Sequence, residues 1–162
     1  MPNDFGKLGE PIEVTEKRVR LAARALARHG LVHAYGHVSA RLDEDRFLVC
    51  AAKPMGMIKE NENGSVVEIN ESLPMGVLGE VRCHQTIYAA RPDINGICRI
   101  FPRNVMTLST FRLTPKARLG FGAYFYPQPP LWDDPLLIRD DLQSKKFADA
   151  LGKANGLVTS EY

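Results

Sequence analysis

The stretch that decides the fold is residues 79–102, GEVRCHQTIYAARPDINGICRIFP. It predicts a helix that begins at Glu80, a turn over residues 91–93 and a buried strand over residues 94–101. Pro92 ends the helix, because proline disfavours helical geometry in the residue before it. The run INGICRIF is mostly apolar, as expected for a buried strand. Arg99 is a charge within that run, so either the strand end faces a polar cleft or Arg99 lies at the surface.

Two polar side chains of this helix, Glu80 and His84, are four residues apart and therefore share one helical face. A carboxylate and an imidazole so placed can share a metal or act as acid and base. The alternative is a glutamate favoured by the helix dipole and a half-buried histidine bonded to backbone. The spacing alone favours that alternative, since a catalytic zinc takes three protein ligands.

A second group of candidate residues precedes this stretch. The segments YGHVSARL and FLVC predict a hairpin with a charged turn. His37, Ser39 and Arg41 alternate along its first strand and so share one face, where they can bind a carboxylate or phosphate with arginine as the bidentate donor. Lys53, in the breaker segment after the second strand, completes the candidate substrate-binding set. An equally weighted alternative is a solvent-facing strand edge.

The remaining elements follow from periodicity, caps and breakers. The sequence predicts a flexible lead-in over residues 1–11 and one domain over residues 12–162. Thr15 is the expected N-cap of an amphipathic first helix that ends at Gly30. Further on we expect a strand at 65–70, a short helix at 102–111, an aromatic strand at 122–126, a helix at 142–153 capped near Asp140 or Asp141, and a strand from 157. This order is a mixed α/β pattern rather than a βαβ repeat.

Composition excludes several classes of protein. The 162 residues indicate one domain, and a net charge of +2 is too weak to argue for nucleic acid or an anionic membrane as partner. No run approaches the ~20 apolar residues of a membrane span. The cysteines, Cys50, Cys83 and Cys98, fit no zinc spacing and point to a reducing cytoplasm, with Cys50 and Cys98 as core residues. Glycine-rich phosphate-binding motifs and a GxSxG elbow do not occur in the sequence.

Taken in order, three segments resemble the class II aldolase/adducin family over almost the whole chain: HGLVHAYGHVSARL, EVRCHQTIYAARPDINGI and DDPLLIRDDLQSKKFADALGKANGLV. The GHVSAR variant is more similar to the decarboxylase-like and oxygenase-like branches than to the sugar-phosphate aldolases. The resemblance implies a three-layer α/β/α domain around a mixed, mainly antiparallel sheet. It also implies a homo-oligomer, since family members are typically tetramers with sites at subunit interfaces.

The resemblance further implies a divalent metal such as zinc, held by three histidines, with a nearby glutamate as acid or base. Glu80 falls on that glutamate. Arg99 and Phe101 stand where the family has a His-x-His pair, and the chain ends at Tyr162 before the segment that carries the third histidine. Arginine has no lone pair for a cation, and phenylalanine has no ligand atom. We therefore expect no metal cofactor.

Three hypotheses follow from these departures. In the first, the chain is a non-metal binding protein or pseudo-enzyme that keeps a pocket for a small anion. In the second, which ranks slightly lower, it is a metal-independent lyase of aldolase or decarboxylase type. Glu80, His84 and Arg99 would then act on a small carboxylate, with Arg99 supplying the positive charge of the missing cation. In the third, the chain is a fragment of a longer protein.

Overall fold

The computed structural model describes residues 9–160, so most of the predicted lead-in lies outside the described residues. Its α-helices are α1 (Ile12–Arg28), α2 (Arg82–Ala90), α3 (Arg103–Thr110) and α4 (Asp141–Leu151). Its strands are β1 (His37–Arg41), β2 (Arg46–Val49), β3 (Ser65–Glu68), β4 (Gly96–Arg99), β5 (Leu131–Trp132) and β6 (Val158–Thr159). Short 3-10 helices are η1 (Met55–Met57), η2 (Gly79–Val81) and η3 (Gly120–Phe125).

The main sheet has the strand order β3-β2-β1-β4, and each neighbouring pair is antiparallel. β1 is therefore central, with β2 on one side and β4 on the other. The small strands β5 and β6 form a separate parallel pair. The prediction of a mixed α/β fold with a mainly antiparallel sheet is confirmed.

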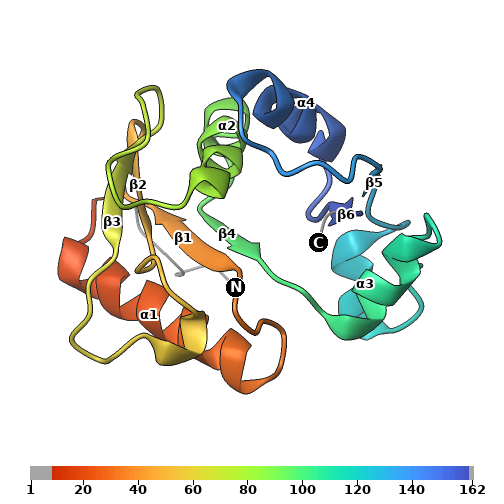
Figure 1. Cartoon of the computed structure of the whole chain (residues 1–162), viewed down its shortest axis with the longest axis horizontal. Helices are drawn as coiled ribbons and strands as arrows, with labels where there is room; N and C mark the ends of the chain where they lie inside the picture. Colours follow the sequence, from red (N-terminus) through yellow and green to blue (C-terminus); the bar gives the residue numbers. More distant parts are fainter. Residues whose placement is uncertain (1–8, 161–162) are drawn as a thin grey trace.

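Helices cover both faces of the main sheet (Figure 1). α1 packs on one face, where Val19 and Ala23 meet Val38 and Leu48. α2 packs on the other face, where Tyr88 joins a cluster that includes Phe47, Val49 and Val67. α4 lies against α2 and extends that layer. Because side chains alternate along a strand, neighbouring residues of β2 supply the cores of both layers.

The helix ends agree in part with their predicted caps. Asp140 accepts a hydrogen bond from the Gln143 backbone N–H at 2.8 Å, so it is the N-cap of α4 as predicted. Gly30, at φ +68°, follows α1 in the predicted left-handed conformation. The predicted N-cap Thr15 is wrong, because α1 begins at Ile12 after Pro11 and Thr15 is buried inside the helix.

Four further predictions are corrected, three of them around the opening stretch. Glu80 does not begin the α-helix; it lies in η2, and α2 begins at Arg82. The strand expected over residues 94–101 is shorter and only partly buried, because β4 pairs on one side only in the described sheet. Cys98 on β4 is exposed rather than a core residue. The expected aromatic strand at 122–126 is replaced by η3 and the residue that follows it.

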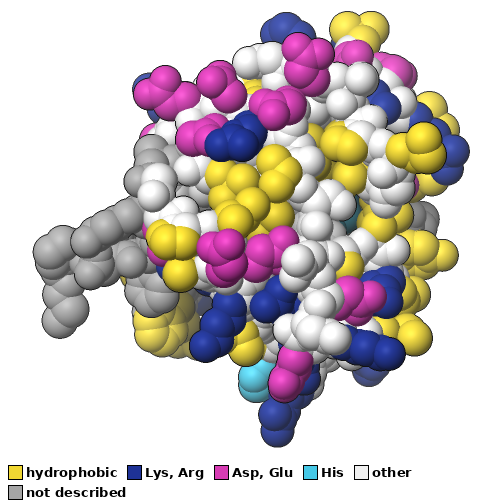
Figure 2. Space-filling model, turned by 90° about the vertical axis from the view of Figure 1, so that its left-hand side faces the viewer, with side chains coloured by type: hydrophobic (Ala, Val, Ile, Leu, Met, Phe, Trp, Pro, Cys, Tyr) yellow, Lys and Arg dark blue, Asp and Glu magenta, His cyan; other side chains and the backbone are white. Residues whose placement is uncertain are grey.

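The described surface carries both signs of charge around a hydrophobic area on the face shown in Figure 2. Large apolar side chains are also exposed along residues 111–126, where Leu119, Phe121 and Tyr126 are 85%, 87% and 80% exposed. Among the helices of the described residues, none combines the length and apolar character needed to cross a membrane.

Candidate functional site

The predicted polar face of β1 is buried rather than solvent-facing. His37, Ser39 and Arg41 are 2%, 2% and 8% exposed, because α2 covers them. His84 of α2 is 1% exposed and packs among them. The alternative of a solvent-facing strand edge is therefore wrong, and the structure brings four of the predicted site residues together in the interior.

A continuous hydrogen-bonded chain joins the two elements. His37 Nδ1 lies 2.9 Å from His84 Nε2, and His84 Nδ1 lies 2.7 Å from Ser39 Oγ. Ser39 Oγ in turn lies 2.8 Å from the Tyr88 hydroxyl. We call His37, His84, Ser39 and Tyr88 the buried polar chain. The buried polar chain ends at His37 Nε2, which is buried and has no hydrogen-bond partner among the described residues. We call this unpartnered end its open end.

Burial decides the protonation states of this chain. It lowers the pKa of His37 to about 3, and the positive charge of Arg99 acts in the same direction. Burial also lowers the pKa of His84 well below its usual value, helped by His37 and Arg99. Burial raises the pKa of the Tyr88 hydroxyl, against the effects of its bond to Ser39 and the Arg41 charge. All members of the chain are therefore neutral near pH 7.

Arg41 makes structural contacts on the same face. Its Nη2 donates to the backbone oxygens of Tyr88 at 2.8 Å and Arg91 at 3.1 Å, and its Nε donates to Ile94 O at 2.9 Å. Its guanidinium carbon also lies 4.7 Å from the centroid of the Tyr88 ring. These bonds fasten the end of α2 and the turn before β4 to the central strand, so the donors that face the interior are already engaged.

Arg99 lies directly opposite His37 in the register of β1 and β4. Residues paired in this way have Cβ atoms about 5 Å apart and project from the same face of the sheet. Gly36 makes this approach possible, because at φ +122° a Cβ there would lie 2.8 Å from the Arg99 carbonyl oxygen. The Arg99 guanidinium carbon is 4.8 Å from the centroid of the Phe101 ring.

Glu80 and Lys53 lie outside the buried polar chain. Glu80 is half-buried in η2, one helical turn before His84, roughly 6 Å further along the axis. α2 runs in the same direction as β1. Glu80, which precedes His84, is therefore displaced from His84 toward the end of the buried polar chain at which His37 lies. Lys53 forms an ion pair with Glu62. The structure therefore does not place Lys53 in the hydrogen-bonded group that contains His37.

Sequence reasoning missed Tyr88. The signal was available, because Tyr88 follows His84 by four residues and so occupies the same face of the helix. Its ring packs 4.9 Å from that of Phe47, while its hydroxyl ends the polar chain. The pattern that indicates Tyr88 is a pair of polar side chains four residues apart on one face of a helix that packs against a polar strand face.

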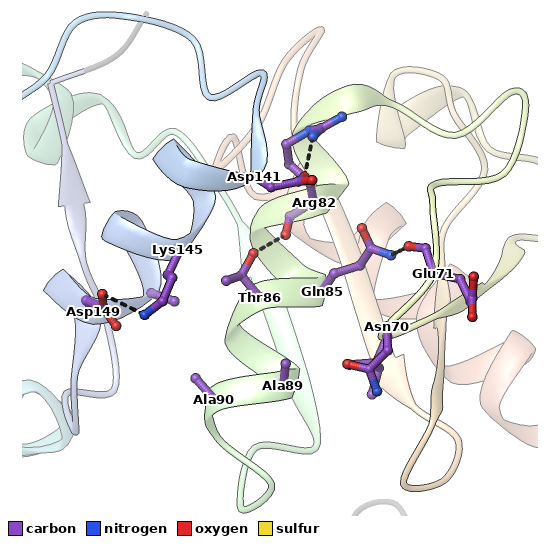
Figure 3. Close-up of a pocket in the computed structure, with 12 residues that line it drawn as sticks. Asn70, Glu71, Arg82, Gln85, Thr86, Ala89, Ala90, Asp141, Lys145 and Asp149 are labelled. Carbon is purple, nitrogen blue, oxygen red and sulfur yellow. Dashed lines mark hydrogen bonds and ion pairs between the residues drawn. The ribbon is translucent and has the colours of Figure 1, made fainter.

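A groove of about 510 Å³ lies elsewhere, between α2, α4 and the loop after β3. Figure 3 shows that its polar groups bond mostly to one another: Arg82 with Asp141, Lys145 with Asp149, and Gln85 with the Glu71 carbonyl oxygen. None of the predicted site residues lines it. Most of the charged side chains that line the groove are therefore already paired with one another.

The side chains near Glu80 bear on the expectation that no metal is bound, which stays a prediction. Residues 9–160 contain no group of three His, Cys, Asp or Glu side chains placed to hold an ion. Both ring nitrogens of His84 and the Nδ1 of His37 are engaged in the chain. Arg99, on the strand end beside them, has no lone pair to donate. His37 Nε2 and the Glu80 carboxylate together are fewer than the three protein ligands that a catalytic zinc takes.

Solved structures with the same fold include three aldolase-family proteins. L-fuculose 1-phosphate aldolase from Glaciozyma antarctica superposes with a TM-score of 0.77 at 18% identity, over 99% of this chain and 66% of that one. An aldolase II superfamily protein from Pseudomonas syringae gives 0.71 at 23% identity, over 90% and 64%. L-fuculose-1-phosphate aldolase from Thermus thermophilus gives 0.72 at 19% identity, over 86% and 72%. The chain thus spans slightly less than two thirds of the first two structures.

Comparison with curated protein sequences finds no match. The family model described as "Class II Aldolase and Adducin N-terminal domain" matches residues 17–160, which include most of α1, the whole main sheet and α4. With the shared fold, this match shows that the chain belongs to the class II aldolase/adducin family.

Proposed function

We propose that this chain is a divergent class II aldolase/adducin-like protein that binds a small anion without a metal. The observation that carries the proposal is the pairing of a buried imidazole nitrogen, His37 Nε2, with the positive charge of Arg99 on the facing strand. Buried polar atoms are rarely left without a partner in native proteins. A ligand that bonds to Nε2 would satisfy it.

The charge of the site favours an anion as that ligand. Arg99 is permanently charged and acts on both His37 and His84. A carboxylate or phosphate oxygen accepts hydrogen bonds and is attracted to a guanidinium, often in bidentate geometry. Arg41 and Ser39, which the sequence placed in the ligand set, are assigned here to supporting roles because their bonds are internal. Lys53 remains a candidate substrate-binding residue, but one that lies outside the buried polar chain.

A metal-independent carbon–carbon lyase of aldolase or decarboxylase type is the second candidate. The observation that favours it is the position of Glu80, a half-buried carboxylate one turn before His84. A carboxylate beside a bound small acid can take or return a proton, while Arg99 stabilises the charge that develops. His84 would support this chemistry by holding His37 in place.

Self-association belongs to the same proposal. Exposed apolar side chains are concentrated in residues 111–126, and a large exposed apolar patch commonly marks an interface. A homo-oligomer would cover them. Among the described residues, Cys50, Cys83 and Cys98 form no disulfide with one another, which supports a reducing cytoplasmic location.

Titration of the protein with acetate and with inorganic phosphate, followed by NMR and calorimetry, tests anion binding. Arg99→Gln is expected to weaken binding about tenfold or more, the effect of one charge-assisted hydrogen bond. Arg103→Gln is the matched control, because Arg103 is an exposed arginine on α3 and its loss should leave affinity unchanged. Equal weakening by both variants would reduce the effect to net charge and contradict the site.

Two further measurements separate the candidates. Elemental analysis of the purified protein is expected to find no stoichiometric divalent metal, and finding one bound by the protein's side chains would overturn the ligand argument. Glu80→Gln should leave anion binding intact. If the chain is a lyase, the same variant should abolish turnover of a small 2-hydroxy or 2-keto acid. Turnover that survives this variant removes Glu80 from the site.

A further inference from the structure

The buried polar chain has a property that depends on all four of its members. Each member is neutral and carries one mobile proton, and three links join them in series. A neutral imidazole donates from one nitrogen and accepts at the other. The direction of one link therefore fixes the direction of the next through each histidine ring.

Two arrangements satisfy the histidine links. In the outward arrangement Tyr88 donates to Ser39, Ser39 donates to His84 Nδ1, and His84 Nε2–H donates to His37 Nδ1. His37 then presents Nε2–H at the open end. In the inward arrangement every link is reversed, and His37 Nε2 presents a lone pair.

The hydrogen bonds available to the Tyr88 hydroxyl distinguish the outward arrangement from the inward one. Ser39 is the side-chain hydrogen-bond partner of the Tyr88 hydroxyl, and the Ile97 backbone N–H, which can only donate, is the other hydrogen-bonding group that lowers the pKa of that hydroxyl. The outward arrangement uses the Tyr88 proton in that bond. In the inward arrangement Ser39 donates to the Tyr88 oxygen, so the Tyr88 hydroxyl proton must bond to a different acceptor. Water is not available to it, because Tyr88 is only 1% exposed. A buried donor without an acceptor is unfavourable.

We propose that His84, Ser39 and Tyr88 are positioning residues that hold His37 as an N–H donor, so that the site accepts small carboxylates and excludes cations and donor groups from Nε2. This inference rests on the proposed anion-binding function and specifies its ligand class. The ligand carboxylate accepts from Nε2–H on one side and from Arg99 on the other. No bond other than hydrogen bonds forms or breaks.

Arg99 opposes the outward arrangement, which makes Ser39 the decisive residue. Arg99 is the register partner of His37, and its charge lowers the pKa of that ring, so a ligand-free site that faces this cation favours a lone pair at Nε2 rather than an N–H. In Ser39→Ala the hydroxyl donor to His84 Nδ1 is lost, and the Arg99 charge then populates the inward arrangement. A bound carboxylate restores the outward one, because it needs the N–H.

The test reads hydrogen-bond direction in ligand-free protein at pH 7.5, by ¹⁵N NMR of the histidine rings and by the scalar coupling across the N–H···N bond. We expect His84 Nε2 as the donor and His37 Nδ1 as the acceptor, with protons on Nε2 of both rings. Protons on Nδ1 of both rings would overturn the inference. Anion titration of the same sample tests the proposed function separately, so the two failures are distinguishable.

Ser39→Ala should give a mixture of both arrangements, which acetate converts to the outward one. Apparent acetate affinity falls by the competent fraction, about twofold for an even mixture. Ser144→Ala is the matched control, because Ser144 is an equally buried serine on α4 whose Oγ lacks a partner among the described residues. If Ser39→Ala leaves ring protonation unchanged, or if Zn²⁺ rather than acetate binds at Nε2, the inference fails. If Ser39→Ala does not fold, the NMR measurement on wild-type protein still decides which ring nitrogens carry the protons.

Discussion

The two faces of β1 are built from opposite chemistry. Val38 and Ala40 point toward α1 and pack in an apolar core with Leu48. His37, Ser39 and Arg41 point toward α2 and are also buried, yet each of them is held there by hydrogen bonds. An apolar face is stabilised by buried area and tolerates changes that keep its volume, whereas a buried polar face depends on each partner being present.

Arg41→Ala breaks the polar face most severely. It leaves the carbonyl oxygens of Tyr88 and Ile94 without the donor that Arg41 supplies, and Arg91 O keeps only its bond from the Ile94 backbone N–H. We expect a loss of about 4 kcal/mol in the free energy of unfolding. Urea denaturation at pH 7.5 measures it. Arg46→Ala is the control, since the Arg46 ion pair with Asp43 is exposed, and its effect should be much smaller. Comparable losses would mean that Arg41 acts only as a charge.

Leu48→Ala tests the apolar face. Leu48 is fully buried against the α1 layer, so its truncation should cost about 3 kcal/mol through lost burial and a residual cavity. Leu48→Met keeps most of the volume and should cost about 1 kcal/mol. The same urea titration applies. A loss for Leu48→Met as large as for Leu48→Ala would show that this face, too, depends on specific partners.

Acid should weaken the polar face selectively. The pKa of His37 is about 3 in the folded state and near 6.5 when unfolded, so the unfolded chain binds more protons below pH 6.5. The stability present above that pH is lost as the pH falls toward 3. For His37 alone the loss is about 2 kcal/mol between pH 7.5 and pH 5, and His84 acts in the same direction.

Urea titrations at both pH values measure this difference. His37→Gln should show a shallower pH dependence than wild type, whereas Leu48→Ala should keep the wild-type slope. A wild-type stability that does not fall on acidification would mean that the histidines are not buried as neutral rings.

Tyr88→Phe makes the smallest change. It removes one hydroxyl and keeps the ring that packs on Phe47, so we expect a loss of about 1 kcal/mol. Tyr124→Phe removes a hydroxyl from an exposed ring and should have no measurable effect. Thermal unfolding of the two variants side by side checks the difference, and indistinguishable curves would remove Tyr88 from the polar chain.

Much of the fold was predictable because local signals are strong. Alternation predicted β1, turn residues bounded β2 and β3, and Asp140 capped α4 as its position suggested. The extent and burial of β4 were not predictable, since an apolar run reads alike in a central strand and in one paired on a single side. Glu80 was assigned to an α-helix because 3-10 and α-helical starts share the same residue preferences.

The sequence supplied candidate site residues but not their arrangement, and their role stays a prediction. His37, Ser39 and Arg41 were placed on one face, but a binding face and a solvent-facing edge stayed equally weighted, because the covering helix could not be inferred from the strand alone. The pairing of His37 with Arg99 depends on the register between strands far apart in the sequence. Such pairings follow from tertiary contacts, which local periodicity does not encode.

The strand order has a consequence for the time course of folding. β1, β2 and β3 are consecutive, so their pairing closes only short loops, whereas β4 joins β1 after α2 has intervened. His84 and Tyr88 therefore reach Ser39 only when both late elements have docked. We expect Ser39→Ala to accelerate unfolding while leaving the refolding rate nearly unchanged. Stopped-flow kinetics measure both rates, and slower refolding of the variant would mean that the buried polar chain forms early in folding.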